Sequence, residues 1–191
     1  MAPLRLAILE ADIPIPGADK KYQGYRGVFR HLLDQAMGPD RPLPSVITLS
    51  GHDVVSDLDS YPPLDSIDAI LISGSKHSAF ESDPWILKLV KYTREALATN
   101  GRVKVVGVCF GHQIVGRALG LPVARSDKGW EVSVTETRLC EKGKELFPGR
   151  EKLVCEPLYV YYYSFIMLSH LGFVFVMPLH NLHSLILRRF V

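Results

Sequence analysis

The sequence has 191 residues, the size of one ordinary domain, and its shares of 47% hydrophobic and 22% charged residues exclude a disordered chain. A net charge of +2 without a basic run gives no reason to expect a nucleic-acid partner. Three irregularly spaced cysteines indicate the thiols of an intracellular protein rather than a disulfide framework, and the first residues lack the long apolar stretch of a signal peptide, so we expect a cytoplasmic domain.

The first four fifths of the chain alternates apolar runs typical of buried strands with segments of helical spacing. In chain order we expect a strand at 5–9, a Pro/Gly loop at 13–17, a helix at 25–37, strands at 45–49 and 68–72, a helix at 84–97, a strand at 103–108 and a helix at 113–119. This alternation predicts an α/β fold with a mostly parallel open sheet and helices on both faces. Functional groups in such sheets lie at the carboxyl ends of the strands.

The helix at 84–97 has a clear start signal. Asp83 is a good N-cap residue, and Pro84 suits the first helical position because its missing N–H would have no partner there. We therefore expect Asp83 to be the N-cap residue of this helix.

Composition changes abruptly after residue 154. Residues 1–154 hold 39 of the 42 charged side chains, and residues 155–191 hold only three. The 22 residues from 158 to 179 carry no formal charge, which reaches the length of a membrane-spanning helix. We therefore expect an incomplete domain at 1–154 and an apolar tail at 155–191.

A Gly-x-Cys-x-Gly pattern spans residues 107–111, between a predicted strand and a predicted helix. It matches a nucleophile elbow with sulfur in place of a hydroxyl, since small flanking residues let the strand and the helix approach at a tight turn. Cys109 would then lie at a helix N-terminus, where the helix dipole favours the thiolate. The amide N–H of Phe110 would contribute to an oxyanion hole. The alternative is that Cys109 is only a small buried hydrophobe.

A second glycine follows the third predicted strand. Gly74 lies between Ser73 and Ser75, where a residue without a side chain lets a backbone N–H face a substrate carbonyl. By itself this glycine would indicate only a strand-to-loop turn, and its pairing with the elbow makes it a candidate second oxyanion donor.

These residues carry a family resemblance. Segment 107–113 resembles the nucleophile motif of class I glutamine amidotransferases. Segments 72–80 and 83–86 resemble a branch of small stand-alone amidotransferase-like proteins that includes fungal members and plant γ-glutamyl peptidases. Segment 128–132 resembles that branch's border of the glutamine pocket. The resemblance covers about residues 4–154 and implies the flavodoxin-like class I amidotransferase fold.

The resemblance also implies a mechanism. Cys109 attacks the carboxamide of glutamine or a γ-glutamyl amide, the N–H groups of Gly74 and Phe110 stabilise the oxyanion, and water then clears a γ-glutamyl thioester. A small-molecule substrate is implied, and we expect neither a metal nor an organic cofactor because the thiol supplies the nucleophile. The residues implied in substrate binding are Ser75, Gln113, Gly129, Trp130 and Glu131.

The sequence departs from the family where the catalytic base is expected. In the family, a histidine oriented by a carboxylate lies near the end of the domain, but no Asp or Glu follows Glu156 here. His170, His180 and His183 therefore have no acidic neighbour. We expect His112 to be part of the helix start rather than a base. We expect His77 to pack or to line the substrate pocket.

Three interpretations of the tail remain open. The first is a membrane anchor, and the second is a genuine part of the domain with strands such as 173–176. The third is translated non-coding sequence, because the codons for Val154-Cys155 also match a splice donor. We favour the third, and with it a truncated hydrolase that lacks its base. One alternative for function is a non-catalytic binding module or pseudoenzyme, with or without a membrane tether, that holds a glutamine-like ligand or a partner subunit. The other is a thiol hydrolase of another substrate. A synthetase partner in trans stays an open question.

Overall fold

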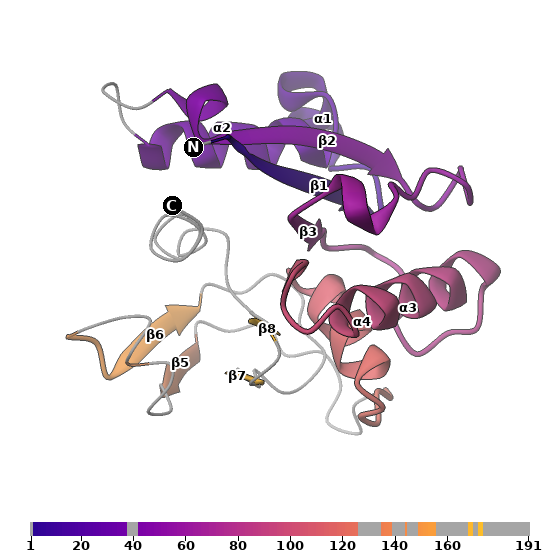
Figure 1. The fold of residues 1–191 in the computed structure, drawn as a ribbon. Helices are drawn as coiled ribbons and strands as arrows, with labels where there is room; N and C mark the ends of the chain where they lie inside the picture. The colour runs from indigo at the N-terminus through magenta and orange to yellow at the C-terminus, as the bar shows by residue number, and fades with distance from the viewer. Residues whose placement is uncertain are drawn as a thin grey trace.

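The computed structural model describes residues 2–37, 42–125, 135–138, 144, 149–155, 168–169 and 172–173. Within these residues, the main body is a four-stranded parallel sheet of β1 (Leu4–Glu10), β2 (Ile47–Asp53), β3 (Ala69–Ile72) and β4 (Lys104–Gly107). The strand order is β2-β1-β3-β4, and Figure 1 shows helices on both sides of these strands. The predicted α/β fold is therefore confirmed.

Helices cover the two faces of this sheet because side chains alternate along each strand. Leu6 and Ile8 of β1 pack on one face with α2 (Tyr25–Met37), and Leu9 packs on the other face with α3 (Pro84–Leu97) and α4 (Phe110–Ala118). The β3 strand has all four of its residues buried, as expected for a strand covered on both faces. The remaining elements here are helix α1 (Pro16–Tyr22) and two 3₁₀ turns, η1 (Leu43–Ser45) and η2 (Leu64–Ser66).

Three expected boundaries were wrong. The second strand does not begin at Ser45 and end at Leu49: Leu43–Ser45 is a 3₁₀ turn, and β2 pairs with β1 as far as Asp53 opposite Glu10. Pro16 and Gly17 start helix α1 instead of belonging to a loop. The last helix starts at Phe110 rather than at Gln113.

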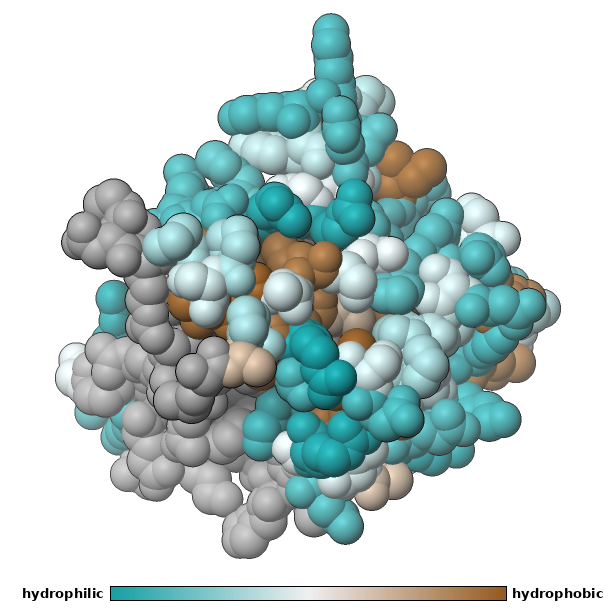
Figure 2. Space-filling model, turned by 45° about the horizontal axis from the view of Figure 1, so that its top comes forward, coloured by the Kyte–Doolittle hydropathy of each residue, from teal (hydrophilic) through white to brown (hydrophobic). Residues whose placement is uncertain are grey.

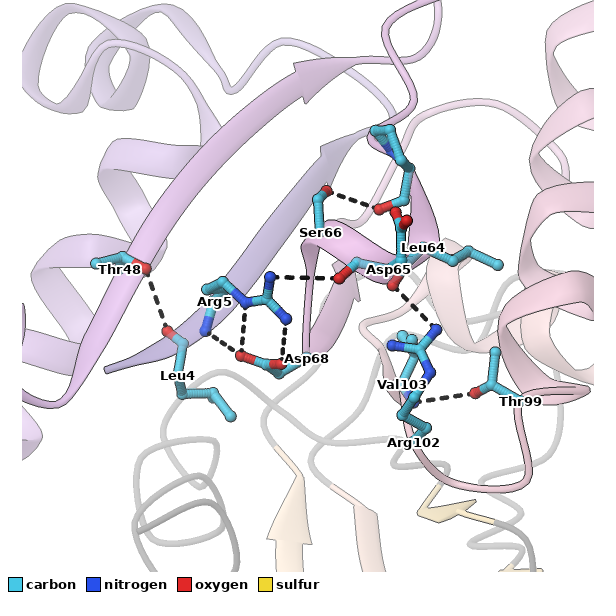
Figure 3. A network of polar contacts seen from close by, with 11 residues as sticks. Leu4, Arg5, Thr48, Leu64, Asp65, Ser66, Asp68, Thr99, Arg102 and Val103 are labelled. Atoms are coloured by element: carbon cyan, nitrogen blue, oxygen red, sulfur yellow. Dashed lines mark hydrogen bonds and ion pairs between the residues drawn. The ribbon is translucent and has the colours of Figure 1, made fainter. Parts of the chain in front are cut away.

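The polar network at the amino ends of the strands is structural (Figure 3). Arg5 at the start of β1 forms an ion pair with Asp68, with Nη2 to Oδ1 at 2.7 Å, and its main-chain N–H donates to the same carboxylate at 2.9 Å. Arg102 donates to the Leu64 carbonyl at 3.1 Å. The Arg5–Asp68 pair is partly exposed, so we expect it to contribute little to stability.

The remaining described strands form two small antiparallel pairs. β5 (Thr135–Arg138) pairs with β6 (Lys152–Cys155), and β7 (Leu168–Ser169) pairs with β8 (Gly172–Phe173). Most of the uncharged stretch 158–179 lies outside the described residues. Among the helices that the structure does describe, none has the length and hydropathy needed to cross a bilayer. The division into 1–154 and 155–191 stays a prediction.

Candidate active site

A pocket of about 700 Å³ opens at the carboxyl ends of the strands. Most of its lining comes from three segments: the loop after β1 (residues 11–15, the β1 loop), the loop after β3 (residues 73–80, the β3 loop), and the turn from β4 into α4 (residues 107–111, the elbow). The remaining lining residues are Pro16, Tyr25, Phe29, Gln113, Val123 and Ala124. From β1 the chain adds β2 on one side of the sheet and then β3 and β4 on the other, so a switch point lies between β1 and β3. Crevices at such switch points are the usual binding sites of open α/β sheets.

Cys109 has a strained backbone at the centre of the elbow. Its φ is +52° and its ψ is −109°, in the region that L-residues rarely adopt. The residue serves as the N-cap of α4 and lines the pocket. Strain of this kind clusters at functional sites, since the surrounding structure has to impose it.

The two glycines of the elbow permit the close contact that imposes this strain. A Cβ on Gly107 would lie 2.6 Å from the main chain of Gly111, and a Cβ on Gly111 would lie 2.3 Å from the Ile72 carbonyl oxygen. No side chain fits at either position without moving the backbone. The Gly-x-Cys-x-Gly pattern thus has a steric cause at this strand–helix junction.

The helix start does not lower the pKa of the Cys109 thiol overall, contrary to the expectation that it favours the thiolate. Burial raises the pKa of the Cys109 thiol, and a hydrogen bond from the Phe110 backbone N–H lowers it by less, so the net shift is upward. Desolvation disfavours the thiolate more than the helix N-terminus favours it. The upward shift therefore favours the protonated form of the thiol.

Gly74 lies against Cys109. A Cβ built on Gly74 would be 3.6 Å from the Cys109 Cβ, which is ordinary contact distance. Ser75 also lines the pocket, and its Oγ accepts a hydrogen bond from the His77 N–H at 3.1 Å.

An aromatic stack links the β3 loop to α3 and α4. The Trp85 ring stacks on Phe110 with centroids 5.6 Å apart, and the His77 ring meets Trp85 edge-on at 5.2 Å. His77 also lines the pocket.

The structure brings together five of the residues predicted for the site. All of them line the pocket: Gly74, Ser75, Cys109, Phe110 and Gln113. The other predicted substrate-binding residues, Gly129, Trp130 and Glu131, lie outside the described residues.

The other histidines fall in different places. His31 packs against Tyr22, and His52 is within 2.9 Å of the Ser50 Oγ, with both pairs outside the pocket lining. His170, His180 and His183 lie outside the described residues.

The sequence analysis missed the β1 loop as part of the site. Asp12, whose side chain is only 8% exposed, binds the β3 loop through Lys76, and Ile13 and Ile15 line the pocket mouth. A usable signal was present, because an acidic residue directly after the first strand lies at the same sheet edge as the elbow.

One cluster near the pocket has metal-ligand chemistry. His77, Glu81 and Asp83 place one donor atom each within 4.8 Å of one another, and the two carboxylates are exposed. Asp83 is the N-cap residue of α3 and Pro84 lies in its first turn, as predicted, although the Asp83 side chain forms no capping hydrogen bond. The positive end of α3 opposes a cation here, so we assign no metal to the cluster.

Comparisons with known proteins identify relatives. The chain is 37% identical to a glutamine amidotransferase-like protein of Schizosaccharomyces pombe over 149 residues, covering 76% of this chain and 59% of that protein. It is 38% identical to gamma-glutamyl peptidase 4 of Arabidopsis thaliana over 116 residues, covering 60% of this chain and 42% of that protein. The matches thus span about half of each relative's length. No protein-family model matches.

Solved structures agree on the fold. A glutamine amidotransferase from Thermotoga maritima matches with a TM-score of 0.56 at 17% identity, over 85% of this chain and 61% of that one. A glutamine amidotransferase from Methylobacillus flagellatus matches with a TM-score of 0.54 at 18% identity, over 86% of this chain and 57% of that one. Likeness at this identity extends to the fold alone.

Proposed function

This chain is a homologue of the glutamine amidotransferase-like proteins and γ-glutamyl peptidases, and from that premise we propose that its pocket cleaves the amide of glutamine or of a γ-glutamyl compound with Cys109 as nucleophile. The observation that carries the proposal is the strained backbone of Cys109, with φ at +52°, between two glycines that no other residue can replace without a clash.

The proposed reaction has two halves. The Cys109 sulfur adds to the γ-carbonyl carbon while its proton passes to a base, and the oxyanion accepts hydrogen bonds from the N–H groups of Gly74 and Phe110. The C–N bond then breaks, and the leaving amine takes the proton from the base. Water adds to the γ-glutamyl thioester, which releases the γ-carboxylate and restores the thiol.

These 191 residues do not contain the base in the form that the family uses, which is a histidine oriented by a carboxylate. No acid follows Glu156, so no histidine after that point has a sequence-adjacent carboxylate to orient it. Because the pKa of the Cys109 thiol is raised, the thiol needs such a base. We therefore infer that this form turns over its substrate slowly, because loss of the base lowers the rate by about 10²–10⁴-fold.

The pocket mouth favours a substrate larger than free glutamine. Ile13 and Ile15 line the pocket yet stay 71% and 77% exposed, and Phe80 lines it at 36%. Hydrophobic atoms also gather in a recess among hydrophilic side chains on the face shown in Figure 2. Exposed apolar side chains beside a nucleophile suit an apolar leaving group on a γ-glutamyl amide.

Labelling with a glutamine analogue tests the proposed nucleophile. Diazo-oxo-norleucine is expected to alkylate Cys109 stoichiometrically in the full chain and to leave Cys140 and Cys155 unmodified, as read by peptide mass spectrometry. The Cys109→Ser variant is the control and is expected to take up no label. Equal and slow labelling of all three cysteines would contradict the proposal.

The second candidate is a non-catalytic module that binds a glutamine-like ligand. The raised pKa of the Cys109 thiol and the lack of an acid after Glu156 favour it. Sequencing of the mature transcript across codons 153–158 separates the two. A spliced message that restores a His-x-Glu motif supports the enzyme, whereas detection of a peptide from residues 155–191 supports the binding module.

A further inference from the structure

Ser73 holds the β3 loop at its start. Its side chain is completely buried, and its hydroxyl accepts a hydrogen bond from the Ala11 N–H at 2.9 Å. The same hydroxyl donates to the Gly74 carbonyl at 2.9 Å. In a regular parallel ladder the Ala11 N–H would bond to the main-chain carbonyl of residue 73. The serine side chain takes that place, which lets the main chain leave the sheet directly before Gly74.

Asp12 holds the same loop on the other side of Gly74. Its carboxylate is 8% exposed and accepts a hydrogen bond from the main-chain N–H of Lys76 at 2.8 Å. It also accepts from the Ile13 N–H at 2.8 Å and forms an ion pair with the Lys76 ammonium at 3.0 Å. The ammonium is 75% exposed, so the main-chain bond is the better defined of the two links to Lys76.

These contacts bracket both peptides of Gly74, the one that carries its N–H and the one that carries its carbonyl. The Gly74 carbonyl faces the Ser73 hydroxyl, and the N–H of a trans peptide points opposite to its carbonyl, so the Ser75 N–H points away from Ser73. Glycine by itself permits many backbone conformations. Fixed points at residues 73 and 76 remove that freedom beside the nucleophile.

We propose that Ser73 and Asp12 form a clamp that positions the β3 loop for transition-state stabilisation at Cys109. Both act through the loop and touch no reacting atom, so they are positioning residues rather than catalytic ones. The clamp rests on the proposed function, because it has a chemical effect only if Gly74 donates to an oxyanion.

The test compares two alkylating reagents on the full chain. Diazo-oxo-norleucine has to place its ketone where the substrate carbonyl would lie, whereas iodoacetamide reports only access to the thiol and its ionisation. The quantity measured is the ratio of the two rate constants for labelling Cys109. In Ser73→Ala and in Asp12→Ala the ratio is expected to fall about tenfold or more, since small misplacements in a site have effects of this size.

Matched controls remove a similar group away from the pocket. Thr93→Val deletes another fully buried hydroxyl, which bonds to the Leu89 carbonyl within α3, and Asp68→Ala deletes the partner of Arg5 at the opposite edge of the sheet. Both are expected to keep the wild-type ratio. Ser73→Thr keeps the hydroxyl and is expected to restore at least part of the ratio.

The outcomes separate the clamp from the proposed function. If diazo-oxo-norleucine does not select Cys109 in the wild-type chain, the proposed function fails. If it selects Cys109 and the ratio is unchanged in both clamp variants, the clamp is overturned and the function stands. Circular dichroism checks each variant for folding. If Ser73→Ala does not fold, Asp12→Ala decides the question, because Asp12 lies in a loop and its removal is expected to disturb folding less.

Discussion

The indole ring of Trp85 stacks on the ring of Phe110, with centroids 5.6 Å apart and an interplanar angle of 27°. This contact joins the first turn of α3 to the first turn of α4, directly after Cys109. Two helix starts beside the pocket are therefore linked by an aromatic contact.

Truncation of that ring is expected to weaken the whole site. Trp85 is 7% exposed, so Trp85→Ala should lower the free energy of unfolding by about 3–5 kcal/mol, while Trp85→Phe should keep most of it. Urea denaturation followed by circular dichroism measures both. Equal losses in the two variants would contradict the prediction, because they would show that an aromatic ring at position 85 recovers none of the stability.

Two glycines of α4 provide a matched pair. A Cβ on Gly111 would meet the Ile72 carbonyl oxygen at 2.3 Å, whereas a Cβ on Gly116 would find its nearest neighbour, Val123, at 3.9 Å. Gly111→Ala is expected to lose about 3 kcal/mol or more of stability through overpacking. Gly116→Ala is expected to gain about 0.5–1 kcal/mol because alanine favours the helix. Thermal denaturation of both proteins checks the difference in sign.

The pH dependence of Cys109 alkylation follows from its burial. Because the pKa of the thiol is raised, the rate with iodoacetamide should reach half its maximum at a higher pH than for an ordinary cysteine, whose pKa is about 8.5. The same shift stabilises the folded chain below the unfolded pKa, and this contribution is lost as the pH rises through the folded pKa. A midpoint at or below that of an unfolded cysteine peptide would contradict the upward shift.

Asp12 gives the opposite dependence at acid pH. Burial raises the pKa of Asp12, but the hydrogen bonds from Lys76 and Ile13 and the charge of Lys76 outweigh it, so the net shift is downward. Its contribution to stability is therefore present above the usual aspartate pKa of about 3.9 and is lost as the pH falls through the lower folded value. Acid unfolding of Asp12→Asn should begin at a higher pH than acid unfolding of wild type. Superimposable curves would mean that the carboxylate contributes no net stability.

The sequence predicted the elements that carry strong local signals. The helices at 25–37 and 84–97 have the predicted bounds, because each has an apolar face or a proline start that the fold then uses. The start of α4 was misplaced by three residues, because the elbow is stabilised by contact of Gly111 with Ile72, which is remote in sequence. The residues implied at the pocket were found through motifs, whereas Asp12 was missed since its partner Lys76 is 64 positions away.

The ionisation of Cys109 could not be predicted from its place at a helix start. The helix dipole is a local property that can be read from the sequence, but desolvation depends on which residues enclose the thiol. The sequence therefore indicated only one of the two opposing effects, and it was the smaller one.

The positive φ of Cys109 means that the residue needed for the proposed chemistry also lowers the stability of the fold. A glycine there would release the strain, which is of the order of 1–3 kcal/mol for such a conformation. Cys109→Gly is therefore expected to melt at a higher temperature than wild type, although Cys109→Ala keeps the strain and should not. The proposed nucleophile therefore stands at a position where glycine would relieve backbone strain, so its reactivity, if the proposed function holds, comes with a loss of folding stability.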